Sequence, residues 1–218
     1  PGSARWRTTA ANYFDWEAEA RTFETMALFS SAGMNWTGDG EPEELLGARV
    51  TASYFDVLGI EPVLGRTFQQ EEHTPGRNRV LILSHGLWQR RFGGSASVLG
   101  KTLNLDGEPF EVIGVMPDAV YPTWPQATGR LPFLPLYQQM WVPMALSEER
   151  RQNRTSHVYG AIARLFPSSS LESARAEMDT IARRLKAAYP ENENGAVTVA
   201  PYLEEVTASA RPALLVLW

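Results

Sequence analysis

Residues 171–188 constrain the fold more than any other segment of this chain. Their apolar residues recur in steps of three and four, which places them on one face of a helix: Leu171, Ala174, Met178, Ile181, Leu185 and Ala188. Ser169 and Glu172 have the spacing of a capping box at its start, and Pro190 closes it. Strand-like runs at 158–165 and 196–203 flank the helix, so the segment predicts a strand–helix–strand unit.

Further strands are predicted in the first two thirds of the chain. Residues 79–83 (RVLIL) form a short apolar run typical of a buried strand. Residues 101–105 and 109–116 flank Asp106-Gly107, a pair that favours a two-residue hairpin turn. Residues 45–51 also read as a strand, after a turn signal at 38–40. Residues 140–144 predict an edge strand, because Pro143 could not donate to a neighbour in a central one.

Three shorter helices complete the pattern. One is predicted over 12–26 with Asn12 as its cap, and one over 53–59 with Ser53 as cap and Gly59 as stop. The third follows Ser84 and ends at Gly93-Gly94. The predicted fold class is therefore α+β, with one large domain or two intertwined subdomains in 218 residues.

Composition excludes several classes of function. Hydrophobic residues make up 44% of the chain, enough for a core without cross-links, and no cysteine is present for disulfides, thiolate catalysis or zinc. The net charge of −5 argues against a nucleic-acid partner, which usually requires a basic face. The short clusters Arg90-Arg91 and Arg150-Arg151 with Arg154 are interpreted as solvated surface.

None of the catalytic motifs is complete. Gly100-Lys101-Thr102 lacks the glycine that a phosphate-binding loop needs five residues earlier, and it leads into a predicted strand. His73, His85 and His157 lack metal-ligand spacing; His73 is expected in an exposed acidic loop and His85 at a solvent-facing helix start. Paired carboxylates are adjacent along the chain, and no nucleophile elbow occurs. We therefore predict no catalytic, cofactor-binding or metal-binding residue, and no enzyme.

The segment 117–137 contains five prolines and is predicted to be a surface loop. An exposed aromatic side chain in such a loop is a candidate contact residue. Trp124 is the main candidate for partner contact, with Tyr121 and Tyr137 beside it. The alternative for Trp124 is a core anchor, as expected for the other tryptophans.

The last residues, 212–218, are strongly apolar. This run favours the first turns of a membrane helix, while a terminal strand or helix packed in the core is the alternative. No run reaches the roughly 20 apolar residues of a complete span.

Several motifs, in their order along the chain, resemble the MacB-like periplasmic core domain of ABC-transporter permeases. They are NYFDW at 12–16, GARV at 47–50, YFDVLG at 54–59, LSHGLWQRRFGG at 83–94, GKTL at 100–103 and VIGVMP at 112–117. The resemblance covers nearly the whole chain and is nearest to the duplicated permeases of soil bacteria, in the type VII, FtsX-like group.

This resemblance implies a porter-like βαβ subdomain built from both chain ends, 1–65 and 154–218, and an inserted strand-rich, sabre-like subdomain, 66–153. It also implies a place on the periplasmic side of the bacterial inner membrane, between two membrane helices of the permease. The partners would be those helices, a cytoplasmic ATPase subunit and a periplasmic adaptor or second permease copy. The domain would transmit ATP-driven motion, and no cofactor is implied.

Two other classes of function stay open on the sequence. One is a secreted α+β hydrolase whose site is assembled from dispersed carboxylates and histidines. The other is a receptor domain for a ligand or peptide, with a groove near Trp124.

Overall fold

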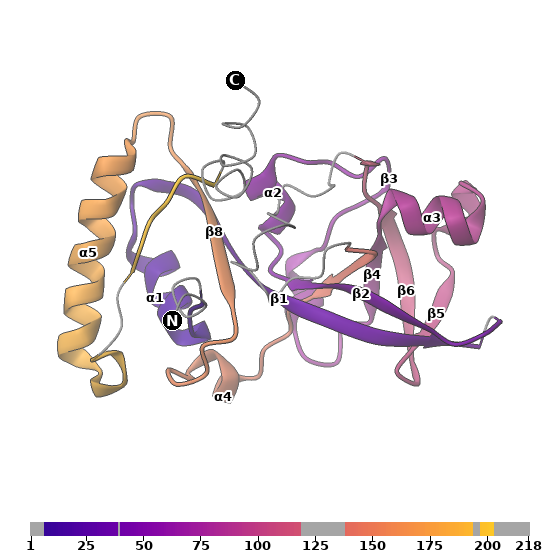
Figure 1. Cartoon of the computed structure of the whole chain (residues 1–218), viewed down its shortest axis with the longest axis horizontal. Coiled ribbons are helices and arrows are strands. Elements are labelled where there is room, and N and C mark those ends of the chain that lie inside the picture. The colour runs from indigo at the N-terminus through magenta and orange to yellow at the C-terminus, as the bar shows by residue number, and fades with distance from the viewer. Residues whose placement is uncertain (1–6, 39, 119–137, 194–196, 203–218) are drawn as a thin grey trace, which may run out of the picture. The chain divides into compact units, whose positions relative to one another are not determined.

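The computed structural model describes residues 7–38, 40–118, 138–193 and 197–202 (Figure 1). These residues form two compact units. Unit 1 contains residues 7–28 and the described residues from 148 onward, and unit 2 contains the described residues between 29 and 147. Both units mix helices and strands, so the α+β fold class is confirmed.

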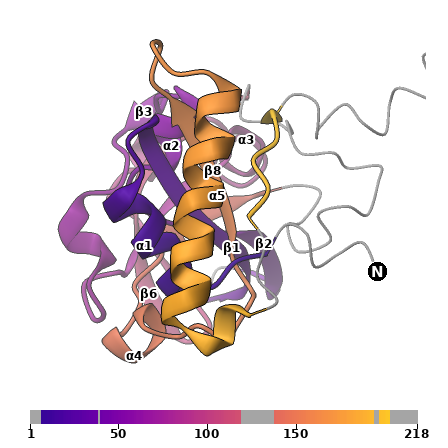
Figure 2. The same ribbon diagram turned by 90° about the vertical axis from the view of Figure 1, so that its left-hand side faces the viewer.

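Unit 1 consists of two main helices and a pair of strands. Its elements are α1 (Ala10–Glu19), the first part of β1 (Phe23–Thr37), α4 (Glu148–Arg151), β8 (Gly160–Leu165), α5 (Leu171–Ala188) and the short helix η5 (Pro190–Asn192). β8 pairs with β1. α5 packs against α1, and Figure 2 shows α5 in front with α1 beside it. The predicted apolar face of α5 is confirmed, because Ala174, Met178, Ile181 and Leu185 are buried.

Three local predictions for unit 1 are wrong. α1 begins after Thr9, whose Oγ1 accepts the N–H of Asn12, and it ends at Glu19 rather than at residue 26. The apolar residues from Phe23 onward lie in β1 instead, because pairing with β8 favours an extended chain there. The capping box of α5 is formed by Ser170 and Ser173, one residue later than predicted. Finally, residues 197–202 contain no strand.

Unit 2 is built on strands. Its elements are the rest of β1, β2 (Glu43–Val50), α2 (Tyr54–Leu58), β3 (Leu64–Gly65), η2 (Gln70–His73), β4 (Val80–Leu83), α3 (His85–Phe92), η3 (Ala96–Val98), β5 (Thr102–Leu105), β6 (Glu108–Val115) and β7 (Met140–Pro143). The strands pair in the order β2-β7-β4-β6-β5-β1, and β1 also pairs with β2. The six strands therefore close into a ring without a free edge.

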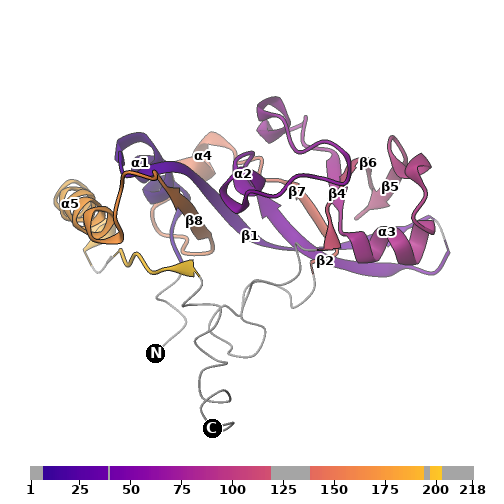
Figure 3. The same cartoon turned by 90° about the horizontal axis from the view of Figure 1, so that it is seen from above.

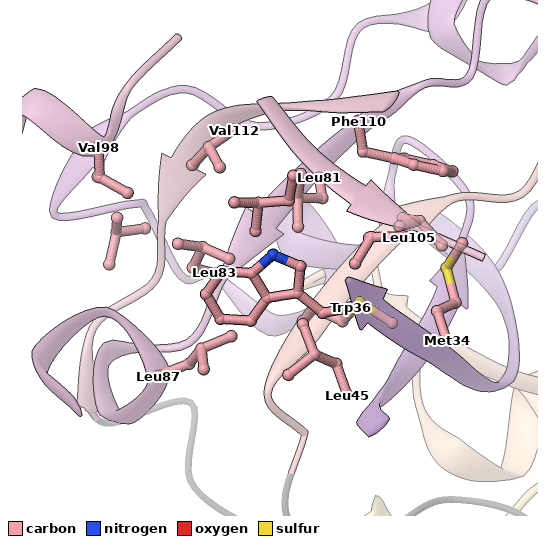
Figure 4. Close-up of a cluster of buried hydrophobic side chains, with 14 residues drawn as sticks. Met34, Trp36, Leu45, Leu81, Leu83, Leu87, Val98, Leu105, Phe110 and Val112 are labelled. Carbon is pink, nitrogen blue, oxygen red and sulfur yellow. The ribbon is translucent and has the colours of Figure 1, made fainter. Parts of the chain in front are cut away.

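The core of unit 2 is apolar and continuous. Fourteen buried side chains from the ring, from η3 and from Leu87 of α3 form one cluster, in which Trp36 lies among Leu45, Leu83 and Leu87 (Figure 4). Leu87 joins α3 to this cluster. Figure 3 shows α3 running alongside the strands of unit 2. This cluster gives unit 2 its own hydrophobic core.

Local signals in unit 2 gave correct predictions. Ser84 caps α3 through its Oγ, which accepts the N–H of Leu87, and Gly93 ends the helix with a positive φ of 61° that favours glycine. Asp106 and Gly107 both have positive φ in the β5–β6 turn, as the pair predicted. Gly59 likewise follows the last residue of α2, whereas Ser53, the predicted cap before α2, makes no side-chain capping hydrogen bond.

The predicted edge position of β7 is wrong. β7 lies between β2, with which it is parallel, and β4, with which it is antiparallel. Pro143 is tolerated because the pairing with β4 involves only Met140 and Trp141, so the missing N–H of Pro143 falls beyond the ladder. Opposite Met140, a Cβ on Gly47 would lie 2.0 Å from the Met140 carbonyl oxygen, and only glycine allows this approach.

Candidate functional site

The residues predicted to contact a partner, Tyr121, Trp124 and Tyr137, lie outside the described part of the chain. Their role therefore stays a prediction. The structure does locate the other groups that the sequence singled out, and it brings together a set of polar residues that the sequence did not.

The three histidines lie on separate elements. His85 is the first residue of α3; it is half-buried, with its ring edge-on to Trp88, rather than solvent-facing as predicted. His157 is exposed, and its Nδ1 lies 3.1 Å from the Thr155 carbonyl oxygen. Within the described residues, no group of three or more His, Asp or Glu side chains could hold a metal ion. Lys101 precedes strand β5, so Gly100-Lys101-Thr102 opens a strand and not a helix.

The segment around His73 differs from the exposed acidic loop that was predicted. Glu72 is buried, and its carboxylate accepts hydrogen bonds from Arg66 Nη1 (3.0 Å), Arg66 Nη2 (2.6 Å) and the Gln69 N–H (2.8 Å). Burial alone would raise the pKa of Glu72, but the hydrogen bonds from Arg66 and the Gln69 N–H, together with the Arg66 charge, outweigh it and the pKa lies below its ordinary value. Burial against Phe68 lowers the pKa of His73. The predicted acidic loop is thus an internal anchor of unit 2.

A second arginine organises unit 1. The side chain of Arg154 is only 13% exposed. Its Nη1 donates to Asn12 Oδ1 (2.9 Å) and forms an ion pair with Asp15 Oδ2 (2.7 Å), while its Cζ lies 3.5 Å from the centre of the Tyr189 ring. The planar guanidinium thus forms an ion pair, a hydrogen bond and a stacking contact at once.

The amide of Asn12 continues this network. Asn12 Nδ2 donates to Asn192 Oδ1 and Asn192 Nδ2 donates to Asn12 Oδ1, both at 3.0 Å, and both residues are buried. We call the five residues Asn12, Asp15, Arg154, Tyr189 and Asn192 the Arg154 joint. It links α1, the segment after α4, and the end of α5 with η5.

Local turns place the members of the joint. After α4, Asn153 Oδ1 accepts the N–H groups of Thr155 and Ser156, so the chain turns sharply at Arg154. Pro190 follows α5 and starts η5, which brings Asn192 back toward α1. The predicted capping role of Asn12 is wrong because Thr9 caps α1, which leaves the Asn12 side chain free to enter the joint.

A third anchor connects α5 to the start of β1. The Glu177 carboxylate accepts the N–H groups of Arg21 (2.8 Å) and Thr22 (3.0 Å) and the hydroxyl of Thr22. Burial alone would raise the pKa of Glu177, but these donors outweigh it, and the pKa lies below its ordinary value. Carboxylates and guanidinium groups held in this way fix segments relative to one another.

Sequence reasoning missed the Arg154 joint. It interpreted Arg154 as part of a solvated basic cluster, which is wrong for this residue. Asn12 lies 142 residues from Arg154 and 180 residues from Asn192, so no spacing rule could have connected them. The only local signal is the turn-forming Asn153 before it.

Comparison with protein families decides the identity of the domain. The family model of the MacB-like periplasmic core domain matches residues 1–181. The chain belongs to this family. Among curated proteins, none matches the chain.

Solved structures share the fold. The periplasmic region of MacB from Actinobacillus actinomycetemcomitans has a TM-score of 0.58 at 15% identity, over 84% of this chain and 75% of that one. A domain of a permease from Porphyromonas gingivalis has a TM-score of 0.58 at 19% sequence identity, over 83% of this chain and 71% of that one. The extracellular domain of the ABC-type transporter YknZ from Gram-positive bacteria has a TM-score of 0.55 at 18% sequence identity, over 84% of each chain.

The MacB-like core domain described here is thus a periplasmic or extracellular, non-catalytic part of an ABC-transporter permease. None of the helices within the described residues has the length and apolar character needed to cross a membrane. The remaining question is what the domain does within the permease.

Proposed function

We propose that this domain transmits a conformational change, driven by ATP hydrolysis in a separate cytoplasmic subunit, to substrate export or to a periplasmic partner. Membership of the MacB-like family carries this proposal. Supporting it, the charged and buried polar groups of both units tie segments together: Arg66 with Glu72, Arg154 with Asp15, and Glu177 with residues 21 and 22. A relay of motion requires such fixed internal geometry.

The finer assignment follows the resemblance. We propose that the domain lies on the periplasmic side of the bacterial inner membrane, between two membrane helices of a type VII, FtsX-like permease of the duplicated kind. The porter-like subdomain would comprise 1–65 and 154–218, with residues 212–218 starting a membrane helix. The inserted sabre-like subdomain would comprise 66–153. An adaptor or a second permease copy would contact Tyr121, Trp124 and Tyr137.

The test uses the complete permease with its ATPase subunit in lipid nanodiscs. The chain has no cysteine, so Arg77→Cys places a single thiol in this domain, at an exposed residue of unit 2. A fluorophore on this thiol and acceptors on the lipid headgroups report the distance of the domain from the membrane. We expect energy transfer to differ between the nucleotide-free state and the state trapped with ATP.

The control is an ATPase subunit that cannot bind nucleotide, which should abolish the difference. Equal energy transfer in both states of the functional complex would contradict transmission of motion by this domain.

A further inference from the structure

We propose that Arg154 is the positioning residue that makes unit 1 move as one rigid body, so that motion entering α1 reaches α5 without loss. This inference rests on the proposed function and adds the residue responsible for coupling within the domain. It rests on the Arg154 joint, which connects α1 with the end of α5 and with η5.

The first argument is that one side chain connects three segments. Arg154 contacts Asn12 and Asp15 of α1 and the ring of Tyr189 after α5. Its own backbone is held by the Asn153 turn, and the Asn153 carbonyl oxygen accepts the N–H of Ala11 at 3.4 Å. Removal of the guanidinium therefore eliminates contacts among all three segments at one point.

The second argument is that the centre of the joint is polar and buried: Asn12 and Asn192 are buried, and the Arg154 side chain is only 13% exposed. Apolar side chains pack with little directional preference, so an apolar contact between helices can shift by small amounts. The reciprocal amide bonds between Asn12 and Asn192 and the fork of Arg154 are satisfied in one arrangement only. A buried network of this kind specifies geometry more than it adds stability.

The third argument concerns the place of the joint in the chain. α1 is the first helix of the described residues, and η5 ends at Asn192, close to their end. In the proposed permease, motion of the flanking membrane helices would enter unit 1 through these segments. The joint lies where both segments meet, so it would hold them at a constant separation during the cycle.

The test variant is Arg154→Met, which keeps the length and apolar character of the side chain but removes the guanidinium. A second variant, Asp15→Asn with Arg154→Met, avoids leaving an unpaired carboxylate and serves if the single variant does not fold. The matched control is Arg66→Met, which makes the same substitution in the Arg66–Glu72 ion pair inside unit 2. Thermal unfolding of each isolated domain checks that the losses of stability are comparable.

Two readouts are made in the complete permease with its ATPase in nanodiscs. Spin labels at Ala18→Cys and Glu191→Cys, both exposed, report the distance between α1 and η5. The energy transfer between Arg77→Cys and the lipid reports motion of the domain. In the wild type we expect a narrow spin-label distance that nucleotide does not change.

In Arg154→Met we expect a broader distribution of spin-label distances, which changes with nucleotide. We also expect the nucleotide-dependent shift in energy transfer to be weaker by about twofold or more. The ATPase rate should stay unchanged, because hydrolysis occurs in another subunit. Arg154→Lys should recover part of the shift, since its ammonium group reaches Asp15 but cannot also stack and bridge.

Other outcomes would contradict the proposal. If Arg154→Met keeps the full nucleotide-dependent shift in energy transfer and a narrow spin-label distance, Arg154 does not have this role. The same holds if Arg66→Met loses as much of the shift in energy transfer as Arg154→Met. A wild-type complex without any nucleotide-dependent shift overturns the proposed function, and the coupling role of Arg154 with it.

Discussion

The interior of unit 2 and the interior of unit 1 are stabilised by different kinds of contact. In unit 2, six strands close into a ring around fourteen buried apolar side chains. In unit 1, the apolar face of α5 is supplemented by a polar joint whose members lie up to 180 residues apart in sequence. Burial of apolar surface supplies stability in proportion to area, whereas buried hydrogen bonds select one arrangement. The difference indicates that apolar packing dominates the interior of unit 2, whereas polar contacts fix the segments of unit 1 relative to one another.

The largest expected effect is loss of packing in unit 2. Leu45 is fully buried in β2, and its neighbour Leu46 is 40% exposed, so the two form a matched pair. Leu45→Ala should lower the free energy of unfolding by about 3 kcal/mol, because it leaves a cavity in the core. Leu46→Ala should cost under about 1 kcal/mol. Urea unfolding followed by circular dichroism measures both, and equal losses would show that the ring core does not dominate.

An intermediate effect is expected at the joint of unit 1. Asn192→Ala leaves the buried Nδ2 of Asn12 without its acceptor, while Asn12 Oδ1 keeps its bond from Arg154. This change should cost about 2 kcal/mol. Asn12→Ala should lower the free energy of unfolding by a similar amount. The double variant should lose clearly less than the sum of the two single losses, because the two side chains act as a pair. Unfolding of the three variants gives this cycle; strict additivity would show that the amides do not interact.

The smallest expected effect depends on pH. The pKa of Glu177 lies below its ordinary value in the folded chain, so its ionised form contributes stability at neutral pH. Glu177→Gln should therefore cost about 1 kcal/mol at pH 7. The difference between wild type and variant should shrink as the pH falls below about 4 and vanish once the folded carboxylate is protonated.

Urea midpoints of both proteins across this pH range provide the measurement. A difference that stays constant down to acid pH would mean that the charge of Glu177 is irrelevant and that only its shape matters.

Elements with local signals could be predicted from the sequence. The apolar spacing of α5, the cap and stop of α3 and the Asp106-Gly107 turn each depend on residues within a few positions of one another. Such signals act before any tertiary contact forms, so the structure confirms them. The family resemblance supplied the rest of the fold class.

Features decided by distant contacts could not be predicted. Phe23 is predicted in a helix because it continues the helical spacing of earlier apolar residues, but it lies in β1, which pairs with β8. Pro143 predicts an edge strand, but β7 lies between β2 and β4 in the ring. The β4–β7 ladder ends before Pro143, so the proline is tolerated. Arg154 is predicted to be a solvated charge because no partner lies near it in the sequence. Its partners, Asn12 and Tyr189, come from distant parts of unit 1. In each case the deciding partner lies far along the chain.

The position of β7 also sets the order in which the domain can fold as it emerges on the far side of the membrane. Because β7 lies between β2 and β4, the ring cannot close until residue 143 has emerged. Asn192, the partner of Asn12, lies 180 residues later, and at synthesis rates of about 5 to 20 residues per second it follows by roughly ten seconds or more. Unit 2 is therefore expected to fold first, while α1 lacks its contact with Asn192 until α5 and η5 have emerged.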